Sequence, residues 1–248
     1  MRDTYRTEAI VLTVKDWREA DRLVTLFSVD NGKIKTVAYG ARKVGSKLAG
    51  ALQPFNHLDM AIERGKDIDI VRQCEVRTSF RDLRADYMLL AYAAMIAELT
   101  MEMFPDRQPD PNVFNLLHNT LNILTARNPR VVAAAGAWQL IDLAGFRPEL
   151  VRCASCRGIL SYPARFSCSA GGAICAGCSG DNLFEFKTET AVLLSRLLDL
   201  DLSRPERFIV NAAALTQVEQ LFSAYSSSIL NSRLRTLTVL RQMLLGGY

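Results

Sequence analysis

Four cysteines form the most specific chemical pattern in this chain of 248 residues. They occur as two C-x-x-C pairs with 18 residues between the pairs: Cys153, Cys156, Cys175 and Cys178. Each close pair lets two thiolates reach one ion from a single tight turn, and four thiolates complete a tetrahedral shell. A complete shell leaves no open position for water or substrate. The spacing therefore predicts one structural zinc ion per chain and not a catalytic one.

Other uses of these cysteines fit the sequence less well. A disulfide framework is typical of small secreted domains, whereas the polar residues 1–6 lack the apolar segment of an export signal. A thioredoxin-like redox pair opens a helix after a strand, whereas Cys153 follows a sequence that ends a helix, residues 145–148. The two histidines, His57 and His118, lie far from the cysteines, and we expect both to be hydrogen-bonded structural residues.

The positive charge of the chain is concentrated in its first third. Residues 1–84 hold 16 Lys/Arg and 12 Asp/Glu, whereas residues 85–248 hold 14 of each. Within residues 31–50 there are five basic residues and no acidic one. This concentration indicates a polyanionic partner for the N-terminal part of the chain.

The N-terminal part predicts a small barrel of strands. Apolar and β-branched residues fall into five runs separated by turn residues: 8–14, 22–29, 33–39, 55–62 and 68–76. Asn31-Gly32 marks a tight hairpin between the second and third runs. Five short antiparallel strands in about 75 residues fit a closed barrel of the five-stranded OB type, because closure leaves no open sheet edge.

After residue 80 the apolar period becomes helical. The helices expected there cover residues 89–103, 111–126, 129–144, 187–199, 211–230 and 232–245. Asp110 and Asn128 each precede a proline and are expected to cap the second and third of these helices. The sequence thus predicts an α+β protein with a barrel domain at 1–80 and a helical domain at 81–248. The cysteine segment 150–181 is expected to be a zinc knuckle inserted into the helical domain.

A glycine-rich stretch at residues 40–47 nearly matches a phosphate-binding P-loop. That motif needs lysine before a hydroxyl residue at the start of a helix, whereas here Ser46 precedes Lys47. Gly50 and Pro54 also prevent a long helix from following. A nucleotide-dependent enzyme that uses this glycine-rich loop is therefore kept only as an alternative function.

A second interpretation of this stretch is a flexible cationic loop. On the third expected strand, Lys33, Lys35 and Tyr39 share one side, because alternate residues point the same way. The loop that follows adds Arg42, Lys43 and Lys47. Basic groups neutralise phosphates, and an aromatic ring can stack on an unpaired base. We expect these six residues to bind DNA; the alternative is a hairpin whose lysines only promote solubility.

Several stretches of the chain resemble the RecO family of bacterial DNA repair proteins. They are Ala9–Leu12, Trp17-x-Glu19-x-Asp21, Gly40–Arg42, Leu48-x-Gly50-Ala51-Leu52-Gln53-Pro54-Phe55, and Leu143–Leu150 running into Cys153-x2-Cys156. The resemblance extends over essentially the whole chain in order, and the combined order and spacing are specific. One departure is Arg157, which follows the second cysteine where the family more usually has glycine.

The resemblance implies a non-enzymatic recombination mediator in the bacterial cytoplasm, associated with the nucleoid. Such a protein binds single- and double-stranded DNA and anneals complementary strands. It is expected to work with RecR and with the acidic tail of single-stranded DNA-binding protein (SSB), and to help RecA load onto coated strands. For the tail we expect a pocket near Arg130, Arg147 and Arg152. A different function class that fits the same features is a zinc-ribbon and OB-barrel factor that binds RNA in transcription or translation.

Overall fold

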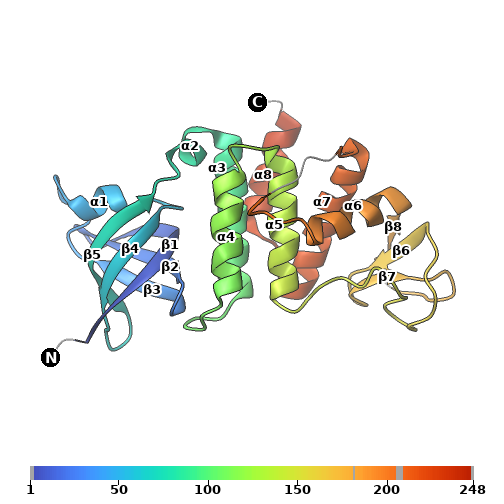
Figure 1. Cartoon of the computed structure of the whole chain (residues 1–248), viewed down its shortest axis with the longest axis horizontal. Coiled ribbons are helices and arrows are strands. Elements are labelled where there is room, and N and C mark those ends of the chain that lie inside the picture. The colour runs from blue at the N-terminus through green and yellow to red at the C-terminus, as the bar shows by residue number, and fades with distance from the viewer. Residues whose placement is uncertain (1–2, 181, 205–208, 247–248) are drawn as a thin grey trace. The chain divides into compact units, whose positions relative to one another are not determined.

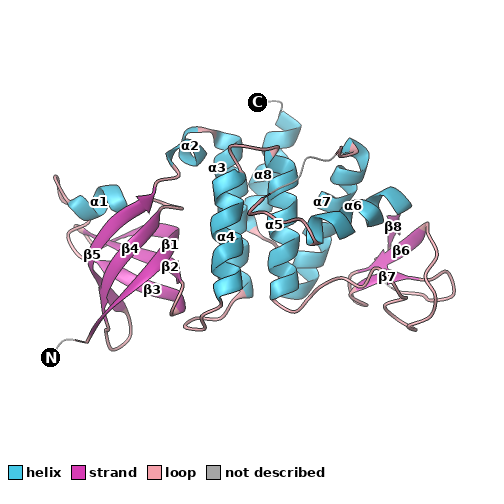
Figure 2. Cartoon of the chain, viewed as in Figure 1, coloured by secondary structure: helices cyan, strands magenta, loops and turns pink. Residues whose placement is uncertain are grey.

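The computed structural model describes residues 3–180, 182–204 and 209–246, with only the backbone of residues 244–246. The chain divides into two compact units, Met1–Ala126 and Arg127–Tyr248. The first unit contains a barrel of strands followed by helices, and the second contains helices with a small three-stranded sheet (Figures 1 and 2). The predicted α+β class is therefore confirmed.

The first unit is built on five strands that form a closed barrel in the order β1-β2-β3-β5-β4. The strands are β1 (Thr4–Trp17), β2 (Asp21–Ser28), β3 (Gly32–Ala38), β4 (His57–Glu63) and β5 (Asp69–Thr78). The long strand β1 pairs with β4 along its first half and with β2 along its second half. A short parallel pairing of Thr36 with Asp69 and of Val37 with Ile70 joins β3 to β5 and closes the barrel.

The barrel interior is filled by inward-facing apolar side chains. They include Ala9, Val11, Val24, Leu26, Ile34, Leu58, Met60, Ile62 and Val71. Alternation along each strand sends every second side chain inward. The short helix α1 (Lys47–Ala51) adds Ala51, and Leu52 follows it into the same core. Ala41 is buried in this core as well, so the segment between β3 and α1 is held at both of its ends.

The outer face of the barrel is covered in part by the segment after α3. The helices of this unit are α1, α2 (Arg81–Ala85), α3 (Tyr87–Met103) and α4 (Pro111–Ile123). Phe104 packs edge-to-face on Phe27 of β2, with ring centroids 6.2 Å apart. A few residues later, the backbone of Gln108 lies against Gly32, where a Cβ atom would stand only 2.0 Å from the Gln108 carbonyl oxygen. Only glycine fits this contact, and Gly32 also has a φ of +63°.

The same segment supplies the cation for a buried carboxylate. Asp69 at the start of β5 is fully buried, and it accepts hydrogen bonds from Tyr5 Oη (2.7 Å) and Arg107 Nη2 (2.9 Å). Burial acts to raise the pKa of Asp69, but these hydrogen bonds and one from the Gly65 N–H outweigh it and lower the pKa. Asp69 is therefore a buried structural carboxylate and not a solvated one. Its partner Arg107 could not be predicted from the sequence, because the two residues lie 38 positions apart in the chain.

The second unit is organised around α5, α6 and α7. Its helices are α5 (Pro129–Leu143), α6 (Thr188–Leu198), α7 (Ala212–Leu230) and α8 (Arg235–Gly246). Trp138 of α5 is fully buried and stacks on Tyr225 of α7, with centroids 5.7 Å apart and planes at 22°. The predicted caps are confirmed: Asp110 accepts from the first N–H groups of α4, and Asn128 does so for α5.

The cysteine segment of the second unit contains a small sheet with the order β7-β6-β8. Its strands are β6 (Ala164–Ser167), β7 (Gly172–Ile174) and β8 (Phe184–Phe186). Phe166 packs on Phe186 at 5.3 Å and on Tyr225 of α7 at 5.6 Å between centroids. These aromatic contacts attach the insert to the helices of the same unit.

The five predicted strands of the N-terminal part are present in the predicted order, with boundaries that differ by a few residues. The expectation that all of them pair antiparallel is wrong, because β3 and β5 pair in parallel where the barrel closes. The domain boundary predicted at residue 80 stays a prediction, and α3 and α4 belong to the same compact unit as the barrel. Within residues 3–180, 182–204 and 209–246, no helix has both the length and the apolar character needed to cross a bilayer.

Candidate nucleic-acid interface and metal centre

The four cysteines come together as one cluster. The sulfur atoms of Cys153, Cys156, Cys175 and Cys178 all lie within 4.8 Å of one another. The Sγ–Sγ distances are 3.7 Å for Cys153–Cys178 and 3.8 Å for Cys156–Cys175. A zinc ion with four sulfur ligands at about 2.3 Å requires sulfur atoms roughly 3.8 Å apart, the edge of that tetrahedron. The cluster thus has the dimensions of a structural metal site.

The first cysteine pair is positioned by a tight turn that places a non-glycine residue in a left-handed conformation. The Arg157 N–H donates to the Cys153 carbonyl (2.9 Å), and the Cys153 N–H donates to the Gly158 carbonyl (3.0 Å). Arg157 has a φ of +62°, which L-residues other than Asn and Asp rarely adopt. A Cβ atom at Gly158 would lie 3.3 Å from Cys156 Sγ, so a small residue is favoured there.

The ionisation of the thiols also indicates a cation. Hydrogen bonds from the Cys156 and Cys175 backbone N–H groups lower the pKa of Cys153 to about 6. The Ser155 hydroxyl favours the Cys178 thiolate, but the nearby sulfurs of Cys156, Cys175 and Cys153 outweigh it and raise the pKa of Cys178 to about 12. The Cys178 thiol therefore stays protonated near neutral pH unless a positive ion lies among the sulfur atoms. The remaining cysteine of this region, Cys168, is half-buried, and burial raises its pKa.

Residues 42–47 form an exposed loop on the first unit, called the basic loop below. It is held by the buried Ala41 at one end and by α1 at the other. Among the residues that the structure describes, none pairs with the ammonium groups of Lys43 or Lys47. These two charges are therefore available to an external anion.

Arg42 connects the basic loop to the turn between β1 and β2. Its guanidinium Nη1 donates to the Arg18 carbonyl (2.9 Å), and its Nε lies 3.4 Å from Asp16 Oδ2. Its backbone N–H donates to the Ala20 carbonyl (2.9 Å). Arg42 thus carries a partly compensated charge and positions the loop against the turn.

Lys33 and Lys35 lie on the same side of β3, as predicted, but an acidic residue lies beside them. Lys33 Nζ is 3.2 Å and Lys35 Nζ 3.1 Å from the Asp106 carboxylate, and Lys33 also donates to the Met101 carbonyl. Partial burial acts to raise the pKa of Asp106, but the hydrogen bonds from Lys35 and Lys33 outweigh it and lower the pKa. The Lys33 side chain is only 13% exposed, against 57% for Lys35. Their role in binding DNA stays a prediction, and it is weaker for Lys33.

Tyr39 follows β3 directly and is 48% exposed. Its ring is therefore accessible next to the start of the basic loop, as a stacking residue requires. The structure brings Tyr39, Lys43 and Lys47 onto one stretch of exposed chain. The acidic neighbours Asp16 and Asp106 could not be assigned from the sequence, because they come from distant segments.

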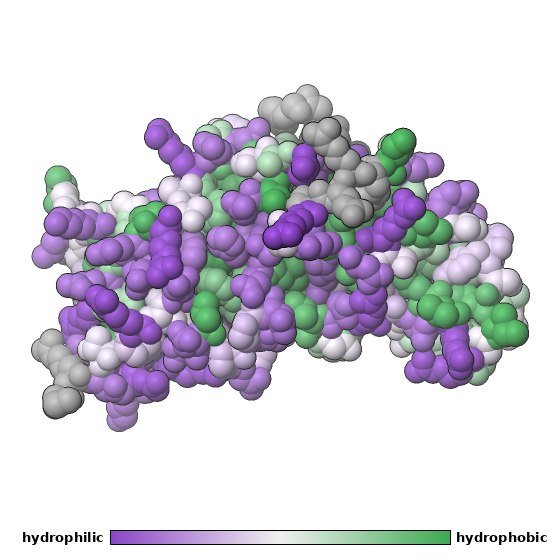
Figure 3. Space-filling model, viewed as in Figure 1, coloured by the Kyte–Doolittle hydropathy of each residue, from purple (hydrophilic) through white to green (hydrophobic). Residues whose placement is uncertain are grey.

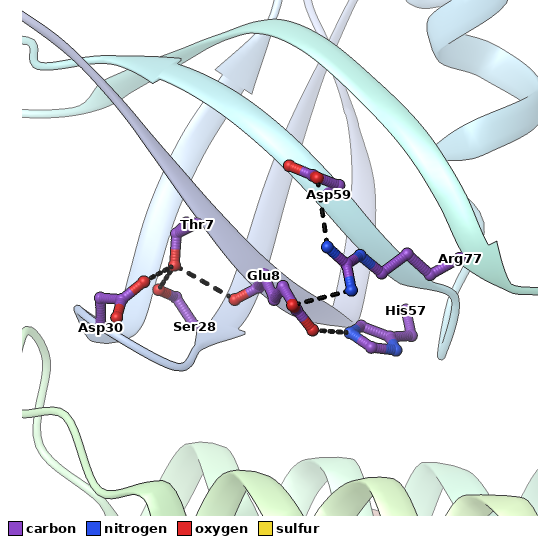
Figure 4. Close-up of polar contacts among 7 residues, drawn as sticks. All are labelled: Thr7, Glu8, Ser28, Asp30, His57, Asp59 and Arg77. Carbon is purple, nitrogen blue, oxygen red and sulfur yellow. Dashed lines mark hydrogen bonds and ion pairs between the residues drawn. The ribbon is translucent and has the colours of Figure 1, made fainter.

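The histidines belong to a polar network on the outside of the barrel. Figure 4 shows His57 Nε2 beside the Glu8 carboxylate, at 3.0 Å, and Arg77 bridging Glu8 (2.8 Å) and Asp59 (3.3 Å). The His118 ring of α4 packs on His57 with centroids 5.1 Å apart. Burial and the neighbouring His118 lower the pKa of His57, although Glu8 acts in the opposite direction. His57 is hydrogen-bonded, as predicted.

A second group of hydrogen bonds in the same view fixes the β2–β3 hairpin. The Thr7 hydroxyl lies 2.8 Å from Ser28 Oγ and 2.8 Å from the Asp30 carboxylate (Figure 4). These contacts hold the end of β2 to β1 and so support the register of the barrel. They suit a structural role.

The three arginines predicted for a partner pocket have different surroundings. Arg130 is bound to both carboxylate oxygens of Glu219, and Arg147 lies between Asp142 (2.5 Å) and Asp199 (2.6 Å). Arg152 is exposed, and no carboxylate is placed beside its guanidinium within the described ranges. The structure therefore does not gather all three into one site.

A cavity of about 350 Å³ is lined by Arg147, one of the residues predicted for that pocket, and by Leu150. Its other lining residues include Glu149, Val151, Arg157 and Leu198. Apolar surface is also exposed over the part of the chain that carries β6, β7 and β8 (Figure 3), and in the cysteine segment Val151 is 81% exposed. The cavity thus combines apolar side chains with two guanidinium groups that are already paired with carboxylates.

Two family models together match most of the chain. The model described as "Recombination protein O N terminal" matches residues 1–80, and that described as "Recombination protein O C terminal" matches residues 84–238. Curated relatives named "DNA repair protein RecO" are similar over nearly the whole chain.

Three of these relatives illustrate the extent of the similarity. The protein of Desulforudis audaxviator is 35% identical over 241 residues, which cover 96% of this chain and 97% of the relative. That of Pelotomaculum thermopropionicum is 34% identical over 223 residues, covering 89% and 87%. That of a Roseiflexus species is 34% identical over 252 residues, covering 98% and 89%.

Proposed function

The chain belongs to the RecO family and has a role in DNA repair and recombination, and from this premise we propose that it is a non-enzymatic mediator that anneals DNA. It binds single- and double-stranded DNA, pairs complementary strands and helps RecA load onto strands coated with SSB. It acts in the bacterial cytoplasm, at the nucleoid. The observation that carries this proposal is the basic loop, in which Lys43 and Lys47 present ammonium groups that no residue in the described part of the chain pairs with.

Annealing needs this kind of surface and no covalent chemistry. Two complementary strands repel each other through their phosphates, and cations bound to both strands lower that repulsion. Lys43 and Lys47 supply exposed charges between Ala41 and Ala51, which are both buried in the barrel core. Arg42 supports the loop, Tyr39 offers a ring for a base, and Lys35 adds charge at the edge of the surface.

The barrel is proposed to be of the OB type. Five strands, closure by a short parallel β3–β5 pairing and a first strand that pairs with both β2 and β4 support this assignment. OB barrels bind single-stranded nucleic acids through basic and aromatic side chains on one face.

The cysteine cluster is proposed to hold one structural zinc ion. Sulfur spacing near that of a tetrahedron and the need for a cation among four thiols support this choice of metal. The ion would fix the turns around Cys153 and Cys175, from which the short strands of the insert extend. No ligand position is left for substrate, so the site is proposed to stabilise the fold.

RecR and the SSB tail are the proposed protein partners. The second unit, residues 127–248, holds 13 Lys/Arg and 9 Asp/Glu, and this net charge of +4 suits contacts with an acidic protein segment. An acidic tail that ends in an apolar residue needs an apolar notch with a cation nearby. The cavity beside Arg147 and Leu150 supplies both, and the exposed Arg152 adds an uncompensated charge outside it.

The tail contact is tested by titrating a fluorescent SSB-tail peptide against single alanine variants. Arg147→Ala, which changes a lining residue, and Arg152→Ala, which changes the exposed residue after the lining residue Val151, should weaken binding. Arg130→Ala should do so less, because Arg130 does not line the cavity and is bound to Glu219. Normal affinity in all three variants would remove this pocket from the proposal. No affinity in the wild type would remove SSB as a direct partner.

The central test is annealing of complementary strands precoated with SSB, with and without its tail. The wild type should anneal tailed complexes faster than tailless ones. Lys43→Glu/Lys47→Glu should abolish annealing while keeping its thermal transition, and the matched control Lys66→Glu/Arg81→Glu, with the same charge change, should retain it. Equal annealing by both variants would refute the proposal. Preferential binding of RNA over DNA would favour an RNA-binding factor instead.

A further inference from the structure

We propose that Trp17 and Arg18 form a stacking site for one unpaired base of single-stranded DNA, next to the basic loop. This inference rests on the proposed function and adds a specific residue pair to it. The ligand is a nucleobase of any identity, because every base offers a flat face for stacking. In the absence of DNA the Arg18 guanidinium covers the Trp17 ring, and a base takes its place on binding.

The fold places this pair at the end of β1. Trp17 is the last residue of the strand and pairs with Asp21, the first residue of β2. Arg18 follows in the turn with a φ of +56°, a conformation uncommon for arginine. The turn therefore holds the Arg18 side chain over the ring of the residue before it.

The contact within the pair resembles the contact proposed with DNA. The Arg18 guanidinium carbon lies 4.3 Å from the centroid of the Trp17 ring. A guanidinium is flat and cationic, and it occupies the ring face that a flat base would use. Among the described parts of the chain, no carboxylate is placed beside Arg18. A base on an aromatic ring contributes more to binding than an exposed cation–π contact, and the displaced guanidinium is then free to bind a phosphate.

Hydrogen bonds connect the pair to the basic loop. Arg42 Nη1 donates to the Arg18 carbonyl, and the Arg42 N–H donates to the Ala20 carbonyl, both at 2.9 Å. The stacking pair and the lysines of the loop therefore belong to one surface. A strand whose phosphates lie on Lys43 and Lys47 has a base within reach of the β1–β2 turn. Tyr39 lies three residues before the same loop and has an accessible ring, so a second base has a ring to stack on.

Intrinsic fluorescence can observe this site directly, because the chain has only two tryptophans. Trp138 is fully buried in the second unit, so DNA that touches the first unit reaches only Trp17. Stacking of a base on Trp17 quenches its emission. A phosphate backbone without bases does not stack and leaves the emission unchanged.

The experiment compares an oligothymidine with an abasic oligomer of the same length and charge, using the full-length protein. The wild type should bind oligothymidine with quenching and bind the abasic oligomer about tenfold more weakly without quenching. Trp17→Leu, which keeps an apolar side chain, should reduce this preference severalfold by weakening the binding of oligothymidine, and it should bind the abasic oligomer as the wild type does. Arg18→Ala should keep the preference, but the slope of log K against log salt should be less steep by about 0.7, the share of one phosphate contact. Tyr87→Leu, which removes an 80% exposed ring on α3, is the matched control and should behave as the wild type.

Different outcomes separate this inference from the proposed function. Unchanged preference for oligothymidine in Trp17→Leu, or weakened binding of the abasic oligomer, would overturn the stacking site while leaving DNA binding in place. Failure of the wild type to bind either oligomer would overturn the proposed function as well. If Trp17→Leu does not fold, quenching of the wild type by oligothymidine alone decides in favour of the site, and its absence decides against it.

Discussion

Replacing Lys43 and Lys47 by glutamine should reduce the salt dependence of DNA binding by a defined amount. Each phosphate neutralised on a single strand changes the slope of log K against log salt by about 0.7, because a condensed counterion is released. Both ammonium groups lack a partner among the residues described, so each is expected to release its full share. The slope for Lys43→Gln/Lys47→Gln should therefore be less steep than that of the wild type by about 1.4.

This difference in slope predicts how the two affinities converge. Between roughly 50 and 200 mM salt, the ratio of wild-type to variant affinity should shrink about sevenfold. Fluorescence anisotropy with a labelled single strand, repeated at five or more salt concentrations, measures both slopes. Because both side chains are exposed and glutamine keeps the methylene groups nearest the backbone, the thermal transition should not change.

A matched double variant separates specific contacts from a general loss of charge. Lys66→Gln/Arg81→Gln removes the same charge from residues outside the proposed DNA surface, because Lys66 lies in the turn between β4 and β5 and Arg81 begins α2. Its slope should stay within about 0.7 of the wild-type value. Equal slopes for the wild type and Lys43→Gln/Lys47→Gln would show that the basic loop is only a solvated turn.

Three further predictions concern the metal, the turn beside it and the response to pH. Cys153→Ser should lower the zinc content, measured by elemental analysis, from about one per chain to near zero and leave the barrel folded by circular dichroism; wild-type protein purified without chelator and lacking zinc would contradict this. Arg157→Gly should stabilise the second unit by about 1 kcal/mol in denaturant titration, because glycine adopts a φ of +62° without strain; a loss of stability would show that the Glu149 ion pair matters more. Folding lowers the pKa of His57, so the unfolded state binds more protons than the folded state in the range between the two pKa values. The free energy of unfolding should therefore fall as the pH drops through about 6.5 towards the pKa of the folded state. His57→Gln should flatten this fall, and identical pH profiles of the two proteins would show that His57 is not its cause.

Local patterns in the sequence were sufficient for the elements and for the cysteine cluster. A C-x-x-C pair is made by one turn, and a helix cap is made by a residue and the three that follow it. Asp110 and Asn128 could therefore be identified as caps, and Cys153 and Cys156 as neighbours, without knowledge of the fold.

Contacts between distant segments could not be predicted in this manner. The stretch 31–50 contains no acidic residue, yet Asp106 lies beside Lys33 and Lys35, and Asp16 lies beside Arg42. The charge count of a segment therefore overstated the free positive charge of the surface. The Trp17–Arg18 pair was missed for another reason: the stacking follows from the φ of Arg18, which no residue pattern indicated.

The contact of residues 106–108 with the barrel limits how the gene for this protein can be recombined with those of its relatives. A crossover at residue 80 would give a barrel whose buried Asp69 depends on an arginine inherited from a different parent. Gly32 and Gln108 approach so closely that the two segments must also be compatible in backbone path. Viable chimeras should therefore take residues 1–126 from one parent. This segment is longer than the barrel, because it includes the helices and the loop that contact the barrel.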